Sequence, residues 1–255
     1  MLASDVYNND IAPAEQLKGW TRFYCPSEPY PSGYFGAAYV DSVAKPSKAI
    51  VAHRGTKSVQ DLVEDISILA DMPFEQLNDA VDFSREVRDI LPAGIEISHT
   101  GHSLGAVIAE IMSMSLLFSL ESITFENPGS LEIFGKWNKK INLDPKIPIK
   151  TCSTIIQSRV NMINTCNTQA GSVYYLKDKK LGLGAHWGRH PESYLENPFY
   201  MTANTLEQHP IAGMLAYLES GGIIAAVEDW PAGFEAGYKM FLADLNTGQS
   251  EAECP

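Results

Sequence analysis

The 255-residue sequence predicts an α/β protein in which a mostly parallel central sheet carries helices on both faces. Two observations support this fold class. Short apolar or β-branched segments alternate along the chain with longer segments whose apolar residues recur at helical spacing. The composition, with 45% hydrophobic and 20% charged residues, is that of an ordinary globular chain, and no repeat or linker divides it. We therefore expect a single domain over residues 1–255.

The first part of the chain should form a pair of antiparallel strands. Short helices are expected at 2–7 and 14–20, before a loop rich in Pro, Gly and Tyr. Strands follow at 34–42 and 49–53. The Lys-Pro-Ser turn between these two strands predicts that they pair antiparallel at an edge of the sheet.

Helices and further strands then alternate as far as residue 176. Helices are predicted at 61–69 and 74–91, where apolar residues recur at helical spacing, and at 106–120, which is almost wholly apolar. The predicted strands are short and apolar or β-branched, and they are 95–100, 122–126, 153–157 and 172–176. This alternation is typical of a parallel sheet. Residues 227–245 again have helical spacing, and we expect that tail to pack on the core without a chemical role.

Charge and composition exclude several classes of function. The chain has 31 acidic residues against 19 Lys and Arg, which gives a net charge of −12. Such a surface repels phosphate backbones and anionic lipid headgroups, so we expect no nucleic-acid partner. No apolar run is long enough for a transmembrane segment, and the first residues do not resemble a signal peptide. We expect a cytoplasmic protein, or one exported by a route without a recognisable signal.

The cysteines and histidines do not indicate a metal site or a cofactor. The four cysteines lack the paired spacing of zinc sites, and no glycine-rich phosphate loop is present. We therefore expect no metal and no cofactor. A chain of this length does not need disulfides, so we favour reduced thiols, with a Cys152–Cys166 bridge as the alternative.

The segment Gly101-His102-Ser103-Leu104-Gly105 matches the G-x-S-x-G pattern of serine hydrolases. The pattern alone is weak, but here it lies between a predicted strand and a predicted helix, where a nucleophile elbow must be. Such a turn strains the serine backbone and needs glycines where other segments pass closely. The N–H of Leu104, at the start of the helix, could then bind an oxyanion. The alternative is an ordinary strand-to-helix turn.

A second motif, His53-Arg54-Gly55-Thr56, follows a predicted buried strand, and with the elbow it resembles class 3 (fungal-type) lipases of the α/β-hydrolase fold. These two motifs are specific. Less specific similarities are the opening helix, Ser58, Asp61, Asp65 and the 125–129 segment. Together the similarities extend in the same order over about residues 1–215. The resemblance implies an oxyanion hole formed by Thr56 and Leu104, with Arg54 in an ion pair with Asp61 or Asp65. The alternative role of Thr56 is a helix N-cap, for which Ser58 is better placed.

The general base should follow the nucleophile in the chain, as in other α/β-hydrolases. His186, His190 and His209 are the histidines after Ser103. We favour His209, because it precedes an apolar helix at the kind of loop-to-helix junction where the resemblance places the catalytic histidine. His186 and His190 lie in a polar, glycine-rich loop and are the alternatives.

The third member of the triad is where the sequence departs from the resemblance. Class 3 lipases have an Asp roughly 60 residues after the nucleophile, but here that stretch contains Asn161 and Asn164 and no Asp. An Asn can hold a histidine tautomer through its carbonyl, although it cannot stabilise the imidazolium by charge. We rank Asn164 first, then Asn161 and then Asp178, with Asp144 as another nearby acid.

The resemblance implies a serine esterase or lipase that hydrolyses carboxylic esters through an acyl-enzyme on Ser103. Lipid esters come first among the substrates, and phospholipase, lysophospholipase and acyltransferase activities are variants of the same chemistry. The partner is then a small-molecule ester or lipid. The alternative is an inactive hydrolase-like scaffold that binds an apolar ligand or a protein, which only the missing Asp supports.

Overall fold

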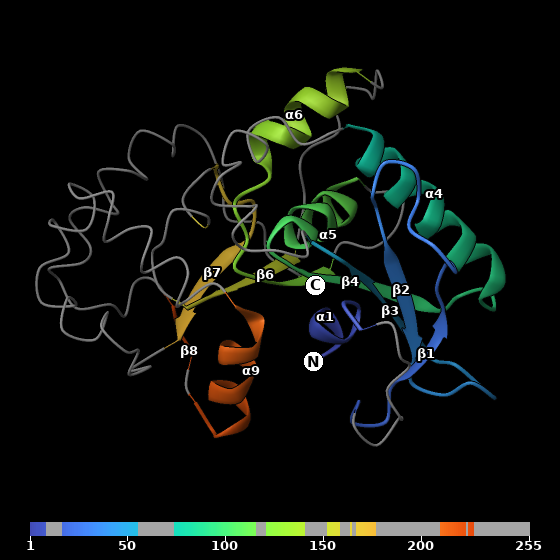
Figure 1. The fold of residues 1–255 in the computed structure, drawn as a ribbon, viewed down its shortest axis with the longest axis horizontal. Coiled ribbons are helices and arrows are strands. Elements are labelled where there is room, and N and C mark those ends of the chain that lie inside the picture. Colours follow the sequence, from blue (N-terminus) through green and yellow to red (C-terminus); the bar gives the residue numbers. More distant parts are fainter. Residues whose placement is uncertain are drawn as a thin grey trace, which may run out of the picture.

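The computed structural model describes residues 1–8, 17–55, 74–115, 121–140, 152–158, 164, 167–176, 210–222 and 224–226. Within them one eight-stranded sheet forms the centre of the molecule, and its strands lie side by side in the order of the chain (Figure 1). The strands are β1 (Thr21–Tyr24), β2 (Gly36–Val40), β3 (Lys48–His53), β4 (Glu96–His102), β5 (Glu121–Phe125), β6 (Cys152–Gln157), β7 (Ser172–Leu176) and β8 (Ile224–Ala226). The predicted α/β class is confirmed.

The pairing of the strands also follows the prediction, with one difference at each edge. Strands β3 to β7 are parallel to one another, whereas β1, β2 and β8 pair antiparallel with their neighbours. The predicted antiparallel pair is therefore confirmed as β2 and β3, but it is not the edge of the sheet, because β1 pairs outside β2. Both β1 and β8 were missed, since strands of three or four residues carry little periodicity.

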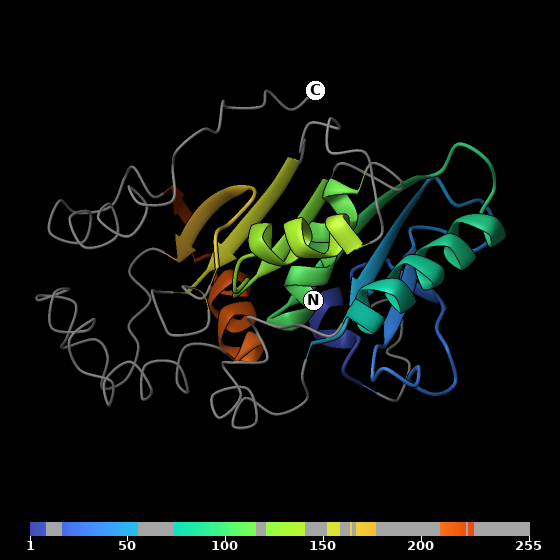
Figure 2. The same cartoon turned by 90° about the horizontal axis from the view of Figure 1, so that it is seen from above.

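Helices cover both faces of the sheet, as predicted. They are α1 (Leu2–Asp5), α4 (Phe74–Ile90), α5 (Leu104–Met114), α6 (Leu131–Lys140) and α9 (Ile211–Glu219). In Figure 1, α4, α5 and α6 lie above the sheet while α1 and α9 lie below it, and Figure 2 shows the same layers from above. Helix α6 was not predicted, although its buried Ile133, Phe134 and Trp137 do follow helical spacing. The helix expected at 14–20 is wrong in the part that the structure describes, because residues 17–19 form a turn. The helices expected at 61–69 and 227–245 lie outside the described residues.

Around β2 and β3 the core divides into one cluster on each face, because strand side chains alternate in direction, and a smaller cluster joins β6, β7 and α9. Along β2, Ala38 and Val40 belong to the cluster under α4 and α5, whereas Ala37 and Tyr39 belong to the cluster with α1. Helix α5 is buried along its whole length, as its apolar sequence predicts. This central position fixes the N-terminus of α5, and so the residue that precedes it, against the sheet.

A buried ion pair attaches α1 to the sheet. The guanidinium of Arg22 on β1 is 2.6 Å from the Asp5 carboxylate, and both side chains are almost fully buried. The hydroxyl of Tyr39 on β2 donates a hydrogen bond of 2.7 Å to the same carboxylate. Burial of a charge is tolerated because every charge here is paired and hydrogen-bonded.

The prediction of reduced cysteines is wrong for one of the two cysteines in the described residues. Cys25 is free, but Cys152 at the start of β6 is disulfide-bonded, to a partner outside the described residues. A disulfide at Cys152 was the alternative, as a Cys152–Cys166 bridge, but the sequence could not decide for it, because disulfide formation depends on the distance and direction between two Cβ atoms in the folded chain. None of the described helices is long and apolar enough to cross a membrane.

Candidate active site

Ser103 stands at the junction between β4 and α5, where its backbone is strained. Its φ of 59° and ψ of −127° are uncommon for a residue with a side chain. The backbone N–H of Ser103 donates to the carbonyl of Phe125 on β5, at 3.0 Å. Ser103 is buried, and among the described residues its Oγ has no hydrogen-bond partner. This is the geometry of a nucleophile elbow: a strained residue at a strand-to-helix turn with an uncommitted hydroxyl.

The glycines of the two motifs are required by close packing around this turn. A Cβ on Gly101 would lie 2.1 Å from the carbonyl oxygen of Gly105, and a Cβ on Gly105 would lie 2.1 Å from that of His53. At Gly55, a Cβ would lie 2.6 Å from the carbonyl oxygen of His102. Contacts this short exclude any side chain. The two motifs therefore pack directly against each other, as the glycines predicted.

Leu104, the predicted oxyanion donor, stands at the N-terminus of α5. Leu104 is the first residue of the helix and is buried beside Ser103. The N–H groups at the start of a helix lack the acceptor that an earlier turn would provide, so the position of Leu104 is consistent with the predicted role. Thr56, the other predicted donor, lies outside the described residues, but the preceding Gly55 already lies against the elbow.

Tyr7, two residues after the end of α1, joins the two motifs, and the sequence did not single it out. Its hydroxyl accepts a hydrogen bond from the Gly55 N–H at 2.9 Å, and it lies 3.4 Å from the carbonyl oxygen of His102. Its ring meets the His102 imidazole edge to face, with 6.3 Å between centroids. Burial raises the pKa of Tyr7 to about 12. Tyr7 is therefore a neutral hydroxyl at neutral pH, and its ring packs against His102.

A buried histidine pair lies across β3 and β4, under the helices. The Tyr34 hydroxyl is 2.9 Å from His53 Nδ1, and His53 Nε2 is 3.0 Å from His99 Nδ1. Burial lowers the pKa of His53 well below its usual value, with the neighbouring His99 adding to the effect. Burial, and then the charge of Arg88, lower the pKa of His99 to about 3. Both imidazoles are neutral at physiological pH and support the sheet.

Arg54 makes a contact that the resemblance did not predict. Its guanidinium lies over the ring of Phe35, 4.5 Å from the ring centroid. This is the geometry of a cation–π interaction. Asp61 and Asp65, its predicted ion-pair partners, lie outside the described residues.

Glu126 is a buried carboxylate at the end of β5, next to the elbow, and sequence reasoning missed it. Its φ of 49° makes it, with Ser103 and Lys18, one of the described non-glycine residues with positive φ. The backbone N–H of Ser158 donates to Glu126 Oε1, and Asn164 Nδ2 donates to Oε2 at 3.2 Å. The predicted Asn164 is thus buried, and it binds a carboxylate.

A second buried glutamate, Glu110, lies in α5, the helix that follows Ser103, and its hydrogen-bond partners differ from those of Glu126. Its Oε2 accepts hydrogen bonds from Asn127 Nδ2 at 2.9 Å and from Ser130 Oγ at 2.5 Å. Burial raises the pKa of Glu110, and these hydrogen bonds oppose the rise. Glu110 therefore ties the middle of α5 to the turn that follows β5.

The remaining predicted site residues cannot be placed. Thr56, Asn161, Asp144, Asp178, His186, His190 and His209 all lie outside the described residues. Their roles stay predictions. In the part of the chain that is described, no three His, Cys, Asp or Glu side chains gather in a way that could hold a metal ion.

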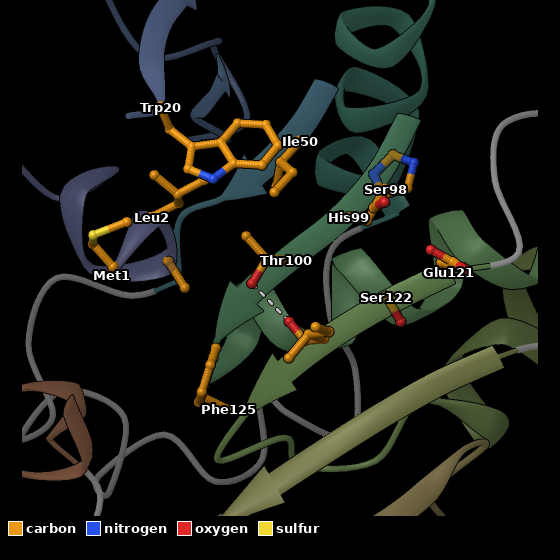
Figure 3. Close-up of a pocket in the computed structure, with 12 residues that line it drawn as sticks. Met1, Leu2, Trp20, Ile50, Ser98, His99, Thr100, Glu121, Ser122 and Phe125 are labelled. Atoms are coloured by element: carbon orange, nitrogen blue, oxygen red, sulfur yellow. Dashed lines mark hydrogen bonds between the residues drawn. The ribbon is translucent and has the colours of Figure 1, made fainter. Parts of the chain in front are cut away.

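A pocket of about 280 Å³ opens on the face of the sheet that carries α1 (Figure 3). Figure 3 shows Leu2 and Trp20 on one side of it and Thr100 and Phe125 on the other, with Thr100 Oγ1 donating to the Ile123 carbonyl at 2.6 Å. Ser103 is not among the residues that line it.

The comparison with known sequences is limited in extent. No family model matches the chain. It is 30% identical over 162 residues to the uncharacterized protein RP165 of Rickettsia prowazekii, a match that covers 55% of this chain and 42% of that protein. The chain thus spans less than half the length of this relative.

The comparison with solved structures concerns the fold. A fungal lipase structure superposes with a TM-score of 0.50 at 16% identity, over 69% of this chain and 77% of the lipase. Lipase II from Rhizopus niveus has a TM-score of 0.47 at 16% identity and the same coverage. At such identities the first of these similarities establishes the fold alone. The chain has the α/β-hydrolase fold that the fungal lipase has.

Proposed function

We propose that this protein is a serine hydrolase that cleaves carboxylic esters through an acyl-enzyme on Ser103, with lipid esters as the leading substrate class. The observation that carries the proposal is Ser103 itself, which is strained, buried and without a hydrogen-bond partner for its Oγ among the described residues. A strained backbone at a residue with an uncommitted nucleophile is a common sign of a functional site. The fold shared with a fungal lipase supports the same reaction class.

In the proposed reaction, Ser103 Oγ attacks the ester carbonyl while a histidine base, for which we favour His209, accepts the hydroxyl proton. The N–H groups of Leu104 and Thr56 bind the oxyanion that forms. The histidine returns the proton to the leaving alcohol as the C–O bond breaks. Water, deprotonated by the same base, then attacks the acyl-enzyme and releases the carboxylic acid and free Ser103.

The test compares Ser103→Ala with a matched control, Ser84→Ala. Ser84 is also buried, but it lies in α4 and donates its hydroxyl to the Ala80 carbonyl. We expect Ser103→Ala to lose ester hydrolysis by about a thousandfold or more, because no nucleophile remains. Ser84→Ala should keep its activity. Wild-type turnover by Ser103→Ala would end the proposal.

A series of ester substrates tests the lipid part of the proposal. p-Nitrophenyl esters of increasing acyl length, at concentrations below their solubility limits, would give kcat/KM for each chain. We expect kcat/KM to rise with acyl length, because each methylene buried in an apolar site contributes about 0.8 kcal/mol. A steady fall from acetate onwards would instead indicate an esterase for short acyl groups.

A further inference from the structure

We propose that Glu126 is the carboxylate that orients the histidine base of this hydrolase and that Asn164 holds Glu126 in place. The inference rests on the proposed function. It changes the role of Asn164 from partner of the base to support of an acid. Glu126 would act through the histidine, so it is a positioning residue.

The first argument is the place of Glu126 relative to Ser103. His102 on β4 is in register with Phe125 on β5, so the next residues of the two parallel strands are Ser103 and Glu126. The Ser103 N–H bond to the Phe125 carbonyl continues that pairing. Neighbouring strands lie about 4.8 Å apart. An imidazole with a hydrogen bond on each nitrogen spans roughly 7–8 Å, so one ring can bridge side chains that start from these two positions.

The second argument is the way the carboxylate is held. Glu126 is fully buried, and its two oxygens accept from the Ser158 N–H and from Asn164 Nδ2. Both donors are neutral. They hold the carboxylate in one orientation, which is what an acid that orients a histidine requires.

The third argument concerns Asn164. An ionised carboxylate only accepts hydrogen bonds, so the amide must turn its NH₂ group toward Glu126. The donor end of Asn164 therefore supports the carboxylate. An Asn alone could fix the tautomer of the base but could not stabilise its positive charge. The pair supplies both, with the charge on Glu126.

The departure from the class 3 pattern then has a simple geometric account. In that pattern the acid comes about 60 residues after the nucleophile, whereas Glu126 comes 23 residues after Ser103 (126 − 103). Strand β5 lies between β4 and β6, and the three are parallel, so their carboxyl ends share one edge of the sheet. An acid after β5 therefore starts from the strand next to the nucleophile. The missing Asp then no longer argues for an inactive scaffold.

The experiment measures kcat, KM and the pH–rate profile of Glu126→Gln, with Glu110→Gln as the matched control. Both glutamates are fully buried and both substitutions keep the shape of the side chain. For Glu126→Gln we expect kcat to fall by about 10²- to 10⁴-fold with little change in KM. The limb on which the base loses its proton should move to lower pH, because loss of a neighbouring anion lowers the pKa of the imidazole. Glu110→Gln should leave that limb in place.

Two further variants separate Glu126 from Asn164 as partner of the base. Glu126→Asp keeps the charge, so it should recover part of kcat and return the limb toward its wild-type pH. The effect of Asn164→Asp depends on whether Asn164 contacts the base or supports Glu126. If Asn164 faced the base, the new carboxylate would retain or raise activity. If Asn164 supports Glu126, the substitution removes a donor, adds a like charge and lowers kcat at neutral pH.

The outcomes distinguish this inference from the proposed function. A wild-type kcat and an unshifted limb in Glu126→Gln, together with an inactive Ser103→Ala, would overturn the role of Glu126 and keep the serine hydrolase. If Glu126→Gln fails to fold, as judged by circular dichroism and thermal unfolding, Glu126→Asp and Asn164→Asp decide. In that case a raised kcat in Asn164→Asp overturns the inference, and a lowered kcat with a shifted limb in the folded protein supports it.

Discussion

Ser103 and Glu126 share a backbone feature that few residues with side chains adopt. Both have positive φ, and they follow the ends of two neighbouring parallel strands. Conformations of this kind cost on the order of 1–3 kcal/mol each and persist where the surrounding structure imposes them. Here the surroundings are the close-packed glycines of the two motifs and the hydrogen bonds that hold the Glu126 carboxylate.

The packing at Gly105 can be tested with a single methyl group. A Cβ at Gly105 would lie 2.1 Å from the His53 carbonyl oxygen, so Gly105→Ala forces β3 and α5 apart. We expect the free energy of unfolding to fall by about 1–3 kcal/mol, with loss of activity, because overpacking of a tight interior is costly. Urea denaturation provides the measurement.

Gly135→Ala in α6 is the control for that substitution. A Cβ at Gly135 would meet nothing within 4 Å. In a helix interior Ala is favoured over Gly by about 1 kcal/mol, so this variant should be as stable as the wild type or more so. Equal destabilisation by the two variants would contradict the account of the elbow.

The histidine pair predicts how stability depends on pH. The pKa values of His53 and His99 in the folded protein lie below the unfolded value near 6.5, and that of His99 is about 3. Below pH 6.5 the unfolded chain therefore binds protons that the folded protein does not. The free energy of unfolding should be highest above pH 6.5 and fall toward pH 3, by up to about 1.4 kcal/mol per pH unit for each histidine.

A urea titration of unfolding between pH 8 and pH 4 measures this dependence. The variant His99→Gln should show a shallower fall than the wild type over the same range, since it has one fewer group that titrates on unfolding. Parallel curves for the two proteins would show that His99 does not contribute.

At the scale of elements, the N-terminal segment contributes to the site through one buried ion pair. The Arg22–Asp5 pair fixes α1 on the sheet, and Tyr7, two residues after Asp5, bonds Gly55 beside the elbow. Removal of one partner leaves the other charge buried and unpaired. The position of α1 is therefore coupled to the candidate active site.

We predict that Arg22→Met destabilises the protein by about 3–5 kcal/mol. The control is Arg85→Ala, which breaks the Arg85–Asp82 pair on α4 at a site where both side chains are more than half exposed. Exposed pairs contribute little, so this variant should stay within about 1 kcal/mol of the wild type. Thermal or urea unfolding of the three proteins gives the comparison, and similar losses in both variants would contradict the role of the buried pair.

The elements that the sequence predicted well are those with a long or strongly apolar pattern. The apolar 106–120 segment correctly indicated the buried helix α5, and 74–91 closely matches α4. Strands β1 and β8 are too short to show a period, and α6 was overlooked because its apolar residues sit among charged ones. The Cys152 disulfide depends on spatial proximity, which spacing along the chain does not give.

At the scale of the whole molecule, the sheet determines which parts of the sequence can form a site. The chain lays its strands side by side in sequence order, and β3 to β7 are parallel, so their carboxyl ends share one edge. Ligands of open α/β sheets bind at this edge. It carries Gly55 after β3, Ser103 after β4, Glu126 after β5 and Ser158 after β6.

The same geometry explains which site residues could be predicted. The elbow is a local motif, so Ser103 and Leu104 could be found from a few adjacent letters. Glu126 lies in the 125–129 segment, which the sequence marked only as a strand end and turn, and the role proposed for it depends on β5 lying beside β4. The sequence analysis looked for an acid about 60 residues after the nucleophile, but the pairing of strands decides which residues lie near Ser103 in the folded protein.

The central claim, that Ser103 is the nucleophile, is tested most directly by covalent labelling with a fluorophosphonate probe. The intact mass of the labelled wild-type protein and a map of its peptides would identify the modified residue. We predict one adduct per chain, on the peptide that contains Ser103, and none in Ser103→Ala. An unmodified wild-type protein, or an adduct on another residue that persists in Ser103→Ala, would contradict the account.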